Sequence, residues 1–327
     1  MKQFSIIVFG GLAAIFAGFG IARGAGWAWS ALEPAVARFG GAVQAADASD
    51  ATIAARAGLQ GAVVTISGLA KKVRYTADQE ESIIDAAARS LPAGADSSVT
   101  AKAYIVKDLT TGAVAAHYNE DMLLPIASLT KLVTAETARK LILPDARIPI
   151  TAQVMATYGN TALFRQGETY TASDLLYPLL MVSSNDAAEA FAQSYGRSRF
   201  IAAMNQFAQS IGAYRTYFAD PSGLSPLNES TASDQAIIIG WLLKNDPSVI
   251  AITELKTKTV RTHTWVNPTH FLNWSYYLGG KNGYTDEAKS TGDSLFAAGA
   301  AKDTYAIVVL GSDNRDADVI KLLAKIK

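Results

Sequence analysis

A serine and a lysine three residues apart, Ser128 and Lys131, are the first candidates for chemistry in this sequence. At positions i and i+3 of a helix they share a face. A serine hydroxyl needs a base within hydrogen-bond distance, and lysine is a base only when burial or a second cation keeps it neutral. Pro125 predicts a helix start near Ala127, which would place the Ser128 N–H where it could stabilise an oxyanion. Such a pair is expected about once by chance in this length, so alone it favours a surface lysine.

Two further groups of polar residues could line the same cleft. Ser183-Ser184-Asn185 follows an apolar run, which places a hydroxyl and an amide at a helix-to-loop corner. Lys281-Asn282-Gly283 offers a cation and an amide on an edge-strand segment, with a glycine that permits close approach. Taken singly, the first group is typical of a helix cap and the second of an Asn-Gly turn. All three groups in this order are much rarer, and together they favour a serine nucleophile with a lysine base.

The elements that must position these groups run from strands to helices and back to strands. Strand-like runs at 100–108 and 112–119 predict a hairpin, and the helix with Ser128 follows. The middle of the chain, roughly 150–250, has apolar residues at three- and four-residue spacing, which predicts helices. Strand-like runs return at 255–265, 294–301 and 304–312, before a last helix at 315–327. This order predicts an α+β fold with one antiparallel sheet built from both ends and an inserted all-helical lobe.

The N-terminal segment predicts a membrane helix. An uncharged run from Phe4 to Ala22 lies between Lys2 and Arg23, and about 19 residues at ~1.5 Å each match the hydrocarbon core of a bilayer. Both a retained anchor and a cleaved signal fit this pattern, and the length of the run favours the anchor. We therefore divide the chain into an anchor or signal segment (1–23), a spacer rich in Ala and Gly (24–97) and a domain (98–327). The domain is expected at the extracytoplasmic face of the cell membrane, or exported after cleavage.

Composition excludes several classes of protein. Among 327 residues the 29 basic and 29 acidic side chains balance, whereas a nucleic-acid-binding protein normally carries a basic excess. The absence of cysteine excludes disulfides, thiol catalysis and cysteine-based metal sites. Three scattered histidines have no metal-ligand spacing, so we expect no metal and no cofactor.

With these motifs assembled, the chain resembles the serine-type D-alanyl-D-alanine carboxypeptidases, which are low-molecular-weight penicillin-binding proteins. The resemblance rests on "LPIASLTKLVTA", "MVSSNDAAEAFA", "DPSGLSPLNESTASDQA" and "KNGYTDEA", and covers roughly residues 98–315. It implies a β-lactamase/transpeptidase-like fold and a peptidoglycan stem peptide as the substrate. It also implies that β-lactams are inhibitors, held at the same serine as slow acyl-enzymes.

The resemblance also implies a role for each matched residue. Ser128 would attack the carbonyl of the penultimate D-alanine, Lys131 would take its proton, and Ser183 would relay a proton to the leaving amine. The implied substrate-binding residues are Asn185, which would also hold Lys131, and Lys281, Asn282, Gly283, Tyr284 and Thr285. The backbone N–H groups of Ser128 and Tyr284 would form the oxyanion hole.

One departure from the family pattern keeps other functions open. Asn282 stands where the family usually has a threonine whose hydroxyl helps to bind the substrate carboxylate, and Thr285 could share that role. The first alternative is therefore a non-catalytic or weakly active homologue that binds peptidoglycan. The second is a class A-type β-lactamase, but that reaction needs a glutamate where this chain has Leu224, upstream of Leu227-Asn228.

Overall fold

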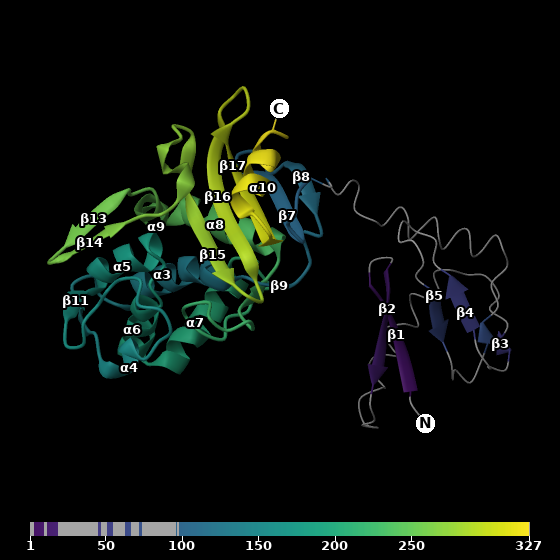
Figure 1. Cartoon of the computed structure of the whole chain (residues 1–327), viewed down its shortest axis with the longest axis horizontal. Helices are drawn as coiled ribbons and strands as arrows, with labels where there is room; N and C mark the ends of the chain where they lie inside the picture. The colour runs from purple at the N-terminus through teal and green to yellow at the C-terminus, as the bar shows by residue number, and fades with distance from the viewer. Residues whose placement is uncertain are drawn as a thin grey trace. The chain divides into compact units, whose positions relative to one another are not determined.

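The computed structural model describes residue 96, residues 98–326, and the backbone of six short strands between residues 3 and 73. The chain forms two compact units, Met1–Ala93 and Gly94–Lys327. The second unit holds all the residues singled out above as candidates for chemistry. Figure 1 labels its helices and strands along the chain.

The described strands of the first unit pair in three antiparallel couples. They are β1 (Gln3–Phe9) with β2 (Leu12–Gly18), β3 (Ala45–Ala46) with β6 (Lys72–Val73), and β4 (Ala51–Ala54) with β5 (Val63–Ile66). The helix expected over 4–22 lies partly outside the described residues, and those described in that range form β1 and β2. An all-apolar run has no periodicity that separates a helix from a buried strand. Most of the predicted spacer, 24–97, lies outside the described residues.

In the part of the chain that the structure describes, no single helix is long and apolar enough to cross a membrane. One pair of helices, Ala232–Asn245 and Pro247–Thr253, reaches the required length and hydropathy together. The two are bent by 105° at their junction, and each buries several apolar residues within the protein. The membrane anchor therefore stays a prediction.

A five-stranded antiparallel sheet is the centre of the second unit, and its order is β15-β16-β17-β7-β8. These strands are β7 (Ala103–Asp108), β8 (Val114–Tyr118), β15 (Tyr277–Thr285), β16 (Lys289–Ala298) and β17 (Asp303–Ser312). The predicted antiparallel sheet built from both ends of the domain is confirmed. The run at 255–265 does not join it, because β13 (Thr257–Val260) and β14 (His263–Val266) form a separate hairpin.

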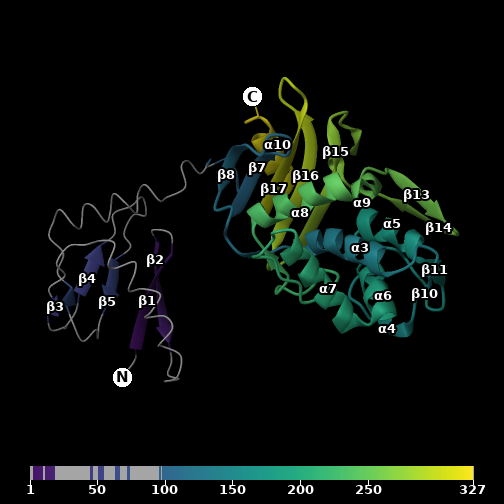
Figure 2. The same ribbon diagram turned by 180° about the vertical axis from the view of Figure 1, so that it is seen from behind.

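The helical lobe lies between β8 and β15 in the sequence, as predicted, and Figure 2 shows it from behind. Its helices are η1 (Ala127–Leu129), α3 (Thr130–Leu141), α4 (Ala152–Met155), α5 (Ala172–Met181), α6 (Asn185–Tyr195), α7 (Arg197–Ser210), α8 (Ala232–Asn245), α9 (Pro247–Thr253) and η2 (His270–Asn273). Short strand pairs join them: β9 (Leu124–Pro125) with β12 (Glu229–Ser230), and β10 (Arg147–Pro149) with β11 (Thr169–Thr171). Thr171, Ser184 and Thr231 cap α5, α6 and α8 with their hydroxyls, as such residues do at helix starts.

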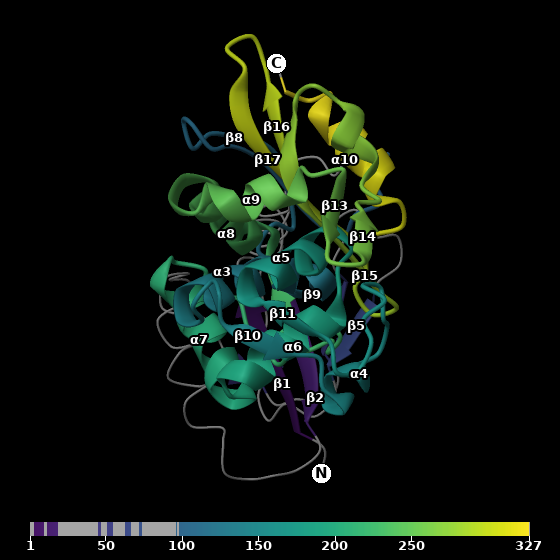
Figure 3. The same cartoon turned by 90° about the vertical axis from the view of Figure 1, so that its left-hand side faces the viewer.

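Both faces of the sheet are buried. Val308 and Leu295 face the helical lobe, whereas Val309 and Phe296, their neighbours along the strands, face α10 (Arg315–Leu323). Figure 3 shows α8 and α9 on one side of the sheet and α10 on the other. Because β15 is an edge strand, one long side remains available to pack against η1, and this packing builds the candidate site.

Candidate active site

Ser128 and Lys131 lie where the chain turns from η1 into α3. The Nζ atom of Lys131 is 2.7 Å from the Oγ atom of Ser128, a hydrogen-bond distance. Ala127 begins this turn with a φ of 46°, in the left-handed region that a non-glycine residue rarely adopts. Such strain is stored at sites where the surrounding structure over-determines the backbone. The predicted contact between the serine and the lysine is therefore present.

Lys131 has the environment of a base. Its side chain is completely buried, and its Nζ also lies 2.5 Å from the carbonyl oxygen of Ser222. Burial lowers the pKa of Lys131 well below its usual value, the positive charge of Lys281 lowers it further, and Asp220 opposes the shift. The surface-lysine interpretation is thus wrong, and a neutral amine within reach of a hydroxyl can activate it.

The loop from Asp220 to Ser225 holds the second contact of Lys131. One carboxylate oxygen of Asp220 accepts from the backbone N–H groups of Ser222 and Gly223, and the other accepts from the N–H of Ser225. Gly223 has a φ of 84°, and a Cβ there would stand 1.9 Å from the carbonyl oxygen of Ala127, so only glycine fits. The sequence correctly indicated a turn, but not that its Ser222 carbonyl reaches Lys131.

Gly283 brings the edge strand against the nucleophile. A Cβ atom at this position would lie 2.7 Å from the backbone nitrogen of Ser128 and 2.8 Å from the Oγ1 atom of Thr291. Thr291 stands opposite Gly283 in the sheet and donates to the carbonyl of Ile126, at 3.2 Å. The close approach expected of Gly283 is therefore present, and it places β15 beside the Ser128 N–H.

Lys281 and Asn282 are neighbours on β15, and the end of the lysine side chain reaches the asparagine. Lys281 is buried, and its Nζ donates to the backbone oxygen of Asn282 at 2.7 Å and to its Oδ1 at 3.3 Å. Burial and the charge of Arg315 lower the pKa of Lys281 to about 7, against the opposing effect of Asp293. The structure thus places a second titratable amine close enough to Lys131 to affect its charge.

Arg315 is a residue that sequence reasoning missed. Its aliphatic stem covers Gly292, where an added Cβ would lie 2.5 Å from the Cδ atom of Arg315. Gly292 is the partner of Asn282 in the sheet, so this cation from the start of α10 lies beside the Asn282 face of β15. Nothing in the local sequence of Arg315 signals this position, because it follows from strand register.

Ser183 and Asn185 occupy the junction between α5 and α6, both of which pack against α3. Ser183 has a φ of 58°, and its buried Oγ atom has no hydrogen-bond partner in the described part of the chain. The amide nitrogen of Asn185 donates to the carbonyl of Tyr158 at 2.8 Å. The described residues show no hydrogen bond between Asn185 and Lys131, and the role expected of Asn185 stays a prediction. A strained serine with an unsatisfied hydroxyl remains available for proton transfer.

The comparisons with known proteins agree with this geometry. The sequence profile of the D-alanyl-D-alanine carboxypeptidase family, Peptidase S11, matches residues 88–314. The chain belongs to this family. A D-alanyl-D-alanine endopeptidase of Pseudomonas aeruginosa is 34% identical over 197 residues, which are 56% of this chain and 63% of that protein. The D-alanyl-D-alanine carboxypeptidase DacB2 of Mycobacterium tuberculosis is 31% identical over 224 residues, 64% of this chain and 73% of that protein.

Solved structures of the same family share the fold. The crystal structure of a D-alanyl-D-alanine carboxypeptidase from Mycobacterium tuberculosis H37Rv has a TM-score of 0.65 and 28% identity, and covers 72% of this chain and 94% of that one. A mutant of the Streptomyces K15 DD-transpeptidase has a TM-score of 0.63 and 26% identity, with 69% and 97% covered. The chain spans 63% of the length of each of the endopeptidases from Pseudomonas aeruginosa and Escherichia coli.

The remaining family positions lie at the end of the β15–β16 hairpin. Tyr284 directly follows Gly283, and its side chain is exposed. The hydroxyl of Thr285 accepts from the backbone N–H of Ala288 at 3.1 Å, so it closes the hairpin turn. Asn282, rather than Thr285, is therefore the polar side chain next to Arg315.

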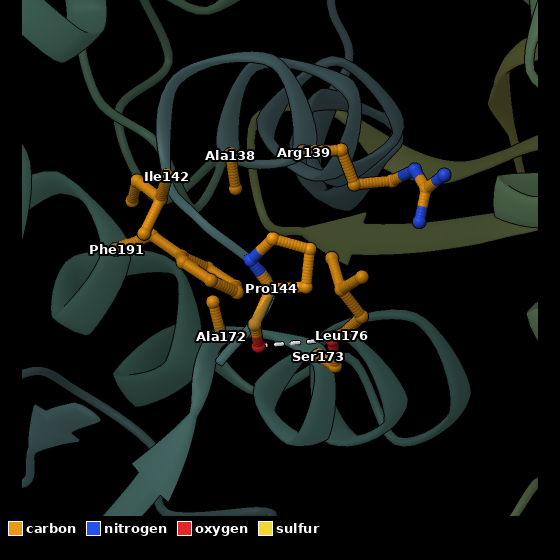
Figure 4. Close-up of a pocket in the computed structure, with 8 residues that line it drawn as sticks. All are labelled: Ala138, Arg139, Ile142, Pro144, Ala172, Ser173, Leu176 and Phe191. Carbon is orange, nitrogen blue, oxygen red and sulfur yellow. Dashed lines mark hydrogen bonds between the residues drawn. The ribbon is translucent and has the colours of Figure 1, made fainter. Parts of the chain in front are cut away.

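A pocket and a metal site are the two other kinds of site to compare with the candidate active site. A small pocket lies at the opposite end of α3 from Ser128 and contains none of the residues above (Figure 4). Its lining residues are Ala138, Arg139, Ile142, Pro144, Ala172, Ser173, Leu176 and Phe191. Among the described residues, no group of three or more His, Asp or Glu side chains is arranged to hold a metal ion.

Proposed function

We propose that this chain is a serine D,D-carboxypeptidase that removes the terminal D-alanine from peptidoglycan stem peptides through an acyl-enzyme at Ser128. The observation that carries the proposal is the buried amine of Lys131, 2.7 Å from the Ser128 hydroxyl and with a strongly lowered pKa. Family membership and the positions of Lys281 and Gly283 beside that pair support it.

The first half-reaction forms the acyl-enzyme. Lys131 takes the hydroxyl proton as the Ser128 oxygen attacks the carbonyl of the penultimate D-alanine. Gly283 brings β15 against the backbone N–H of Ser128, and Tyr284 is the next residue of that strand. The backbone N–H groups of Ser128 and Tyr284 stabilise the oxyanion. The C–N bond then breaks, and the amine of the leaving D-alanine receives a proton through Ser183. Water attacks the ester in the second half-reaction, releases the shortened peptide and returns the proton to Ser128.

Three residues on β15 and α10 suit the terminal carboxylate of the substrate. Lys281 and Arg315 supply positive charge, and the amide of Asn282 supplies a hydrogen-bond donor between them. A carboxylate drawn to this end of the cleft would hold the scissile bond beside Ser128. The same charges would bind the carboxylate of a β-lactam, which makes penicillins inhibitors that acylate the enzyme.

The direct test is release of D-alanine from a muropeptide with a pentapeptide stem. Wild type should release one D-alanine per stem, and Ser128→Ala should release none while keeping its circular dichroism spectrum and melting temperature. Ser210→Ala removes an exposed hydroxyl on α7 that only bonds within its own helix, so it should behave as wild type. Unchanged release by Ser128→Ala would reject the proposal.

Two alternatives give different outcomes in related assays. A cross-link-cleaving endopeptidase, the activity named for the Pseudomonas aeruginosa and Escherichia coli relatives, would open dimeric muropeptides and leave pentapeptide stems intact. A peptidoglycan-binding homologue without catalysis would bind muropeptides and release nothing. A β-lactamase would turn over a chromogenic cephalosporin rapidly. The last is disfavoured because Leu224 replaces the required glutamate, and because the nearby Asp220 carboxylate is engaged by loop N–H groups.

We also propose that the N-terminal segment holds the domain at the extracytoplasmic face of the cell membrane. The uncharged run from Phe4 to Ala22 is the support for this localisation. The test expresses the full chain with a C-terminal tag in a bacterial host. An anchored protein should keep Met1, leave the membrane fraction with detergent but not with high salt, and be digested by protease added to spheroplasts. A mature N-terminus beyond residue 23 would show cleavage instead.

A further inference from the structure

Asp293 is a buried carboxyl in the middle of β16 that no step above uses. Its side chain is completely buried, and neither oxygen has a hydrogen-bond partner in the described part of the chain. It stands directly opposite Lys281 in the β15–β16 register, which brings the two Cβ atoms to about 4.5–5.5 Å. Its other sheet partner is Val308, whose side chain belongs to the apolar core under the helical lobe. A buried carboxyl in apolar surroundings needs a physical reason.

The charged groups near the candidate site show which cation Asp293 can pair with. Asp220 already accepts from four donors of its own loop, and Asp316 accepts from Arg315 and His270. The charge of Asp293 raises the pKa of Lys281 against the effects of burial and Arg315, the charge of Lys281 lowers the pKa of Asp293, and Lys131 is a further cation that interacts with Lys281. Within the described residues, Asp293 is thus the carboxyl that faces Lys281 without another partner.

We propose that Asp293 is the counter-ion of Lys281 and keeps that amine protonated over the pH range in which Ser128 is acylated. Asp293 is a positioning residue, because it acts through Lys281 and does not face the reacting atoms. The inference rests on the proposed function, in which a cationic Lys281 keeps Lys131 neutral and attracts the carboxylate of the substrate.

The charges of Lys281 and Asp293 depend on which of the two groups is protonated. Burial raises the pKa of Asp293 to about 8 and lowers that of Lys281 to about 7, and the charge of each group opposes the shift of the other, so their titrations are coupled. Two hydrogen bonds, to the backbone oxygen and the Oδ1 atom of Asn282, stabilise the charged form of Lys281. Attraction between a carboxylate at Asp293 and the ammonium group of Lys281, its partner across the strands, also stabilises the charged form of Lys281. On the basis of these two interactions, which oppose the effect of burial, we assign the proton to Lys281 and the negative charge to Asp293.

The test measures the pKa of Lys281 directly and needs no activity. Lysines labelled with ¹³C at Cε are titrated by NMR in the full-length protein, and the Lys281 signal is assigned by its loss in Lys281→Arg. Asp293→Asn, of nearly equal size, should lower the pKa of Lys281 by about one unit or more. Asp293→Leu, which matches the neighbouring Leu295 and Val308, should give the same shift if the asparagine variant does not fold. An unchanged Lys281 pKa in either folded variant would overturn the proposal.

A matched control and a functional readout complete the test. Asp318→Asn removes another completely buried carboxylate, on α10, and should leave the Lys281 titration unchanged even if it lowers the melting temperature. In acylation by penicillin, Asp293→Asn should move the alkaline limit of the rate profile to lower pH by the same interval. If wild type is not acylated at all, the proposed function fails, while the NMR titration still decides the role of Asp293.

Discussion

The contact between Gly283 and Ser128 gives the sharpest prediction for the mechanism. Gly283 has ordinary strand dihedrals, so Gly283→Ala adds a methyl group without straining the backbone. That methyl would lie 2.7 Å from the Ser128 nitrogen and 2.8 Å from Thr291 Oγ1, whereas carbon packs against such atoms at roughly 3.5 Å. β15 and the start of η1 must therefore separate by about 0.8 Å. The Ser128 and Tyr284 N–H groups would then no longer converge on one oxyanion.

The expected loss follows from the cost of a misplaced oxyanion donor. Removing one such donor lowers the rate by about 10²- to 10³-fold, and we expect Gly283→Ala to slow acylation by about 10²-fold. The assay is the second-order rate of labelling by a fluorescent penicillin, with the melting temperature measured in parallel. Gly240→Ala on α8 is the matched control, because its methyl meets only the flexible side chain of Leu109. Labelling within about threefold of wild type by a folded Gly283→Ala would refute the reasoning.

Three other substitutions test separate parts of the account. Asp220→Ala removes the acceptor for three backbone N–H groups and frees the Ser222 carbonyl from its place beside Lys131. We expect a loss of about 2–4 kcal/mol in urea unfolding and at least about tenfold slower acylation; unchanged acylation would mean that the Ser222 contact does not matter. Glu136 is completely buried on α3, and burial followed by the neighbouring Asp246 raises its pKa to about 7. The unfolded chain therefore loses this proton first as the pH rises, so folding stability falls between about pH 5 and 8. Glu136→Gln should be more stable than wild type by roughly 2–3 kcal/mol at pH 8 and equal to it near pH 4, and equal stability at both would contradict the assignment. Asn282→Thr restores the usual family residue beside Arg315 and should raise kcat/KM for D-alanine release by about 3- to 10-fold; a fall would show that asparagine is the better partner here.

The sequence located the candidate catalytic residues because their signals are local. The i, i+3 spacing placed Lys131 against Ser128, and the glycine of Lys281-Asn282-Gly283 indicated an edge strand that approaches another backbone. Each of these inferences needs only the geometry of one helix or one strand. The antiparallel sheet followed from the order of strands and helices.

The missed contacts depend on register and loop conformation. Arg315 reaches the site only because Gly292 pairs with Asn282, and Asp293 faces Lys281 only because of the same register. Register is fixed by turn geometry and by which face is buried, and the sequence pattern of these two strands did not give it. The carbonyl of Ser222 was missed for a related reason, since a backbone oxygen has no signature in the side-chain pattern.

The N-terminal apolar run shows a different limit. Length and hydropathy predicted a helix over 4–22, and the structure has the strands β1 and β2 in that range. Hydropathy measures a preference for leaving water, which a helix and a paired strand satisfy equally. Fractionation and N-terminal sequencing, rather than hydropathy, will decide whether this segment is an anchor.

The central claim, that Ser128 is the nucleophile, is tested most directly by mass spectrometry of the penicillin adduct. Trypsin yields the peptide 108–131, in which Ser128 is the only serine, and the peptide 166–197, which contains Ser183. We expect one penicilloyl group per chain, on the peptide 108–131, and none in Ser128→Ala. An adduct on the peptide 166–197, or no adduct on the folded protein, would contradict the account.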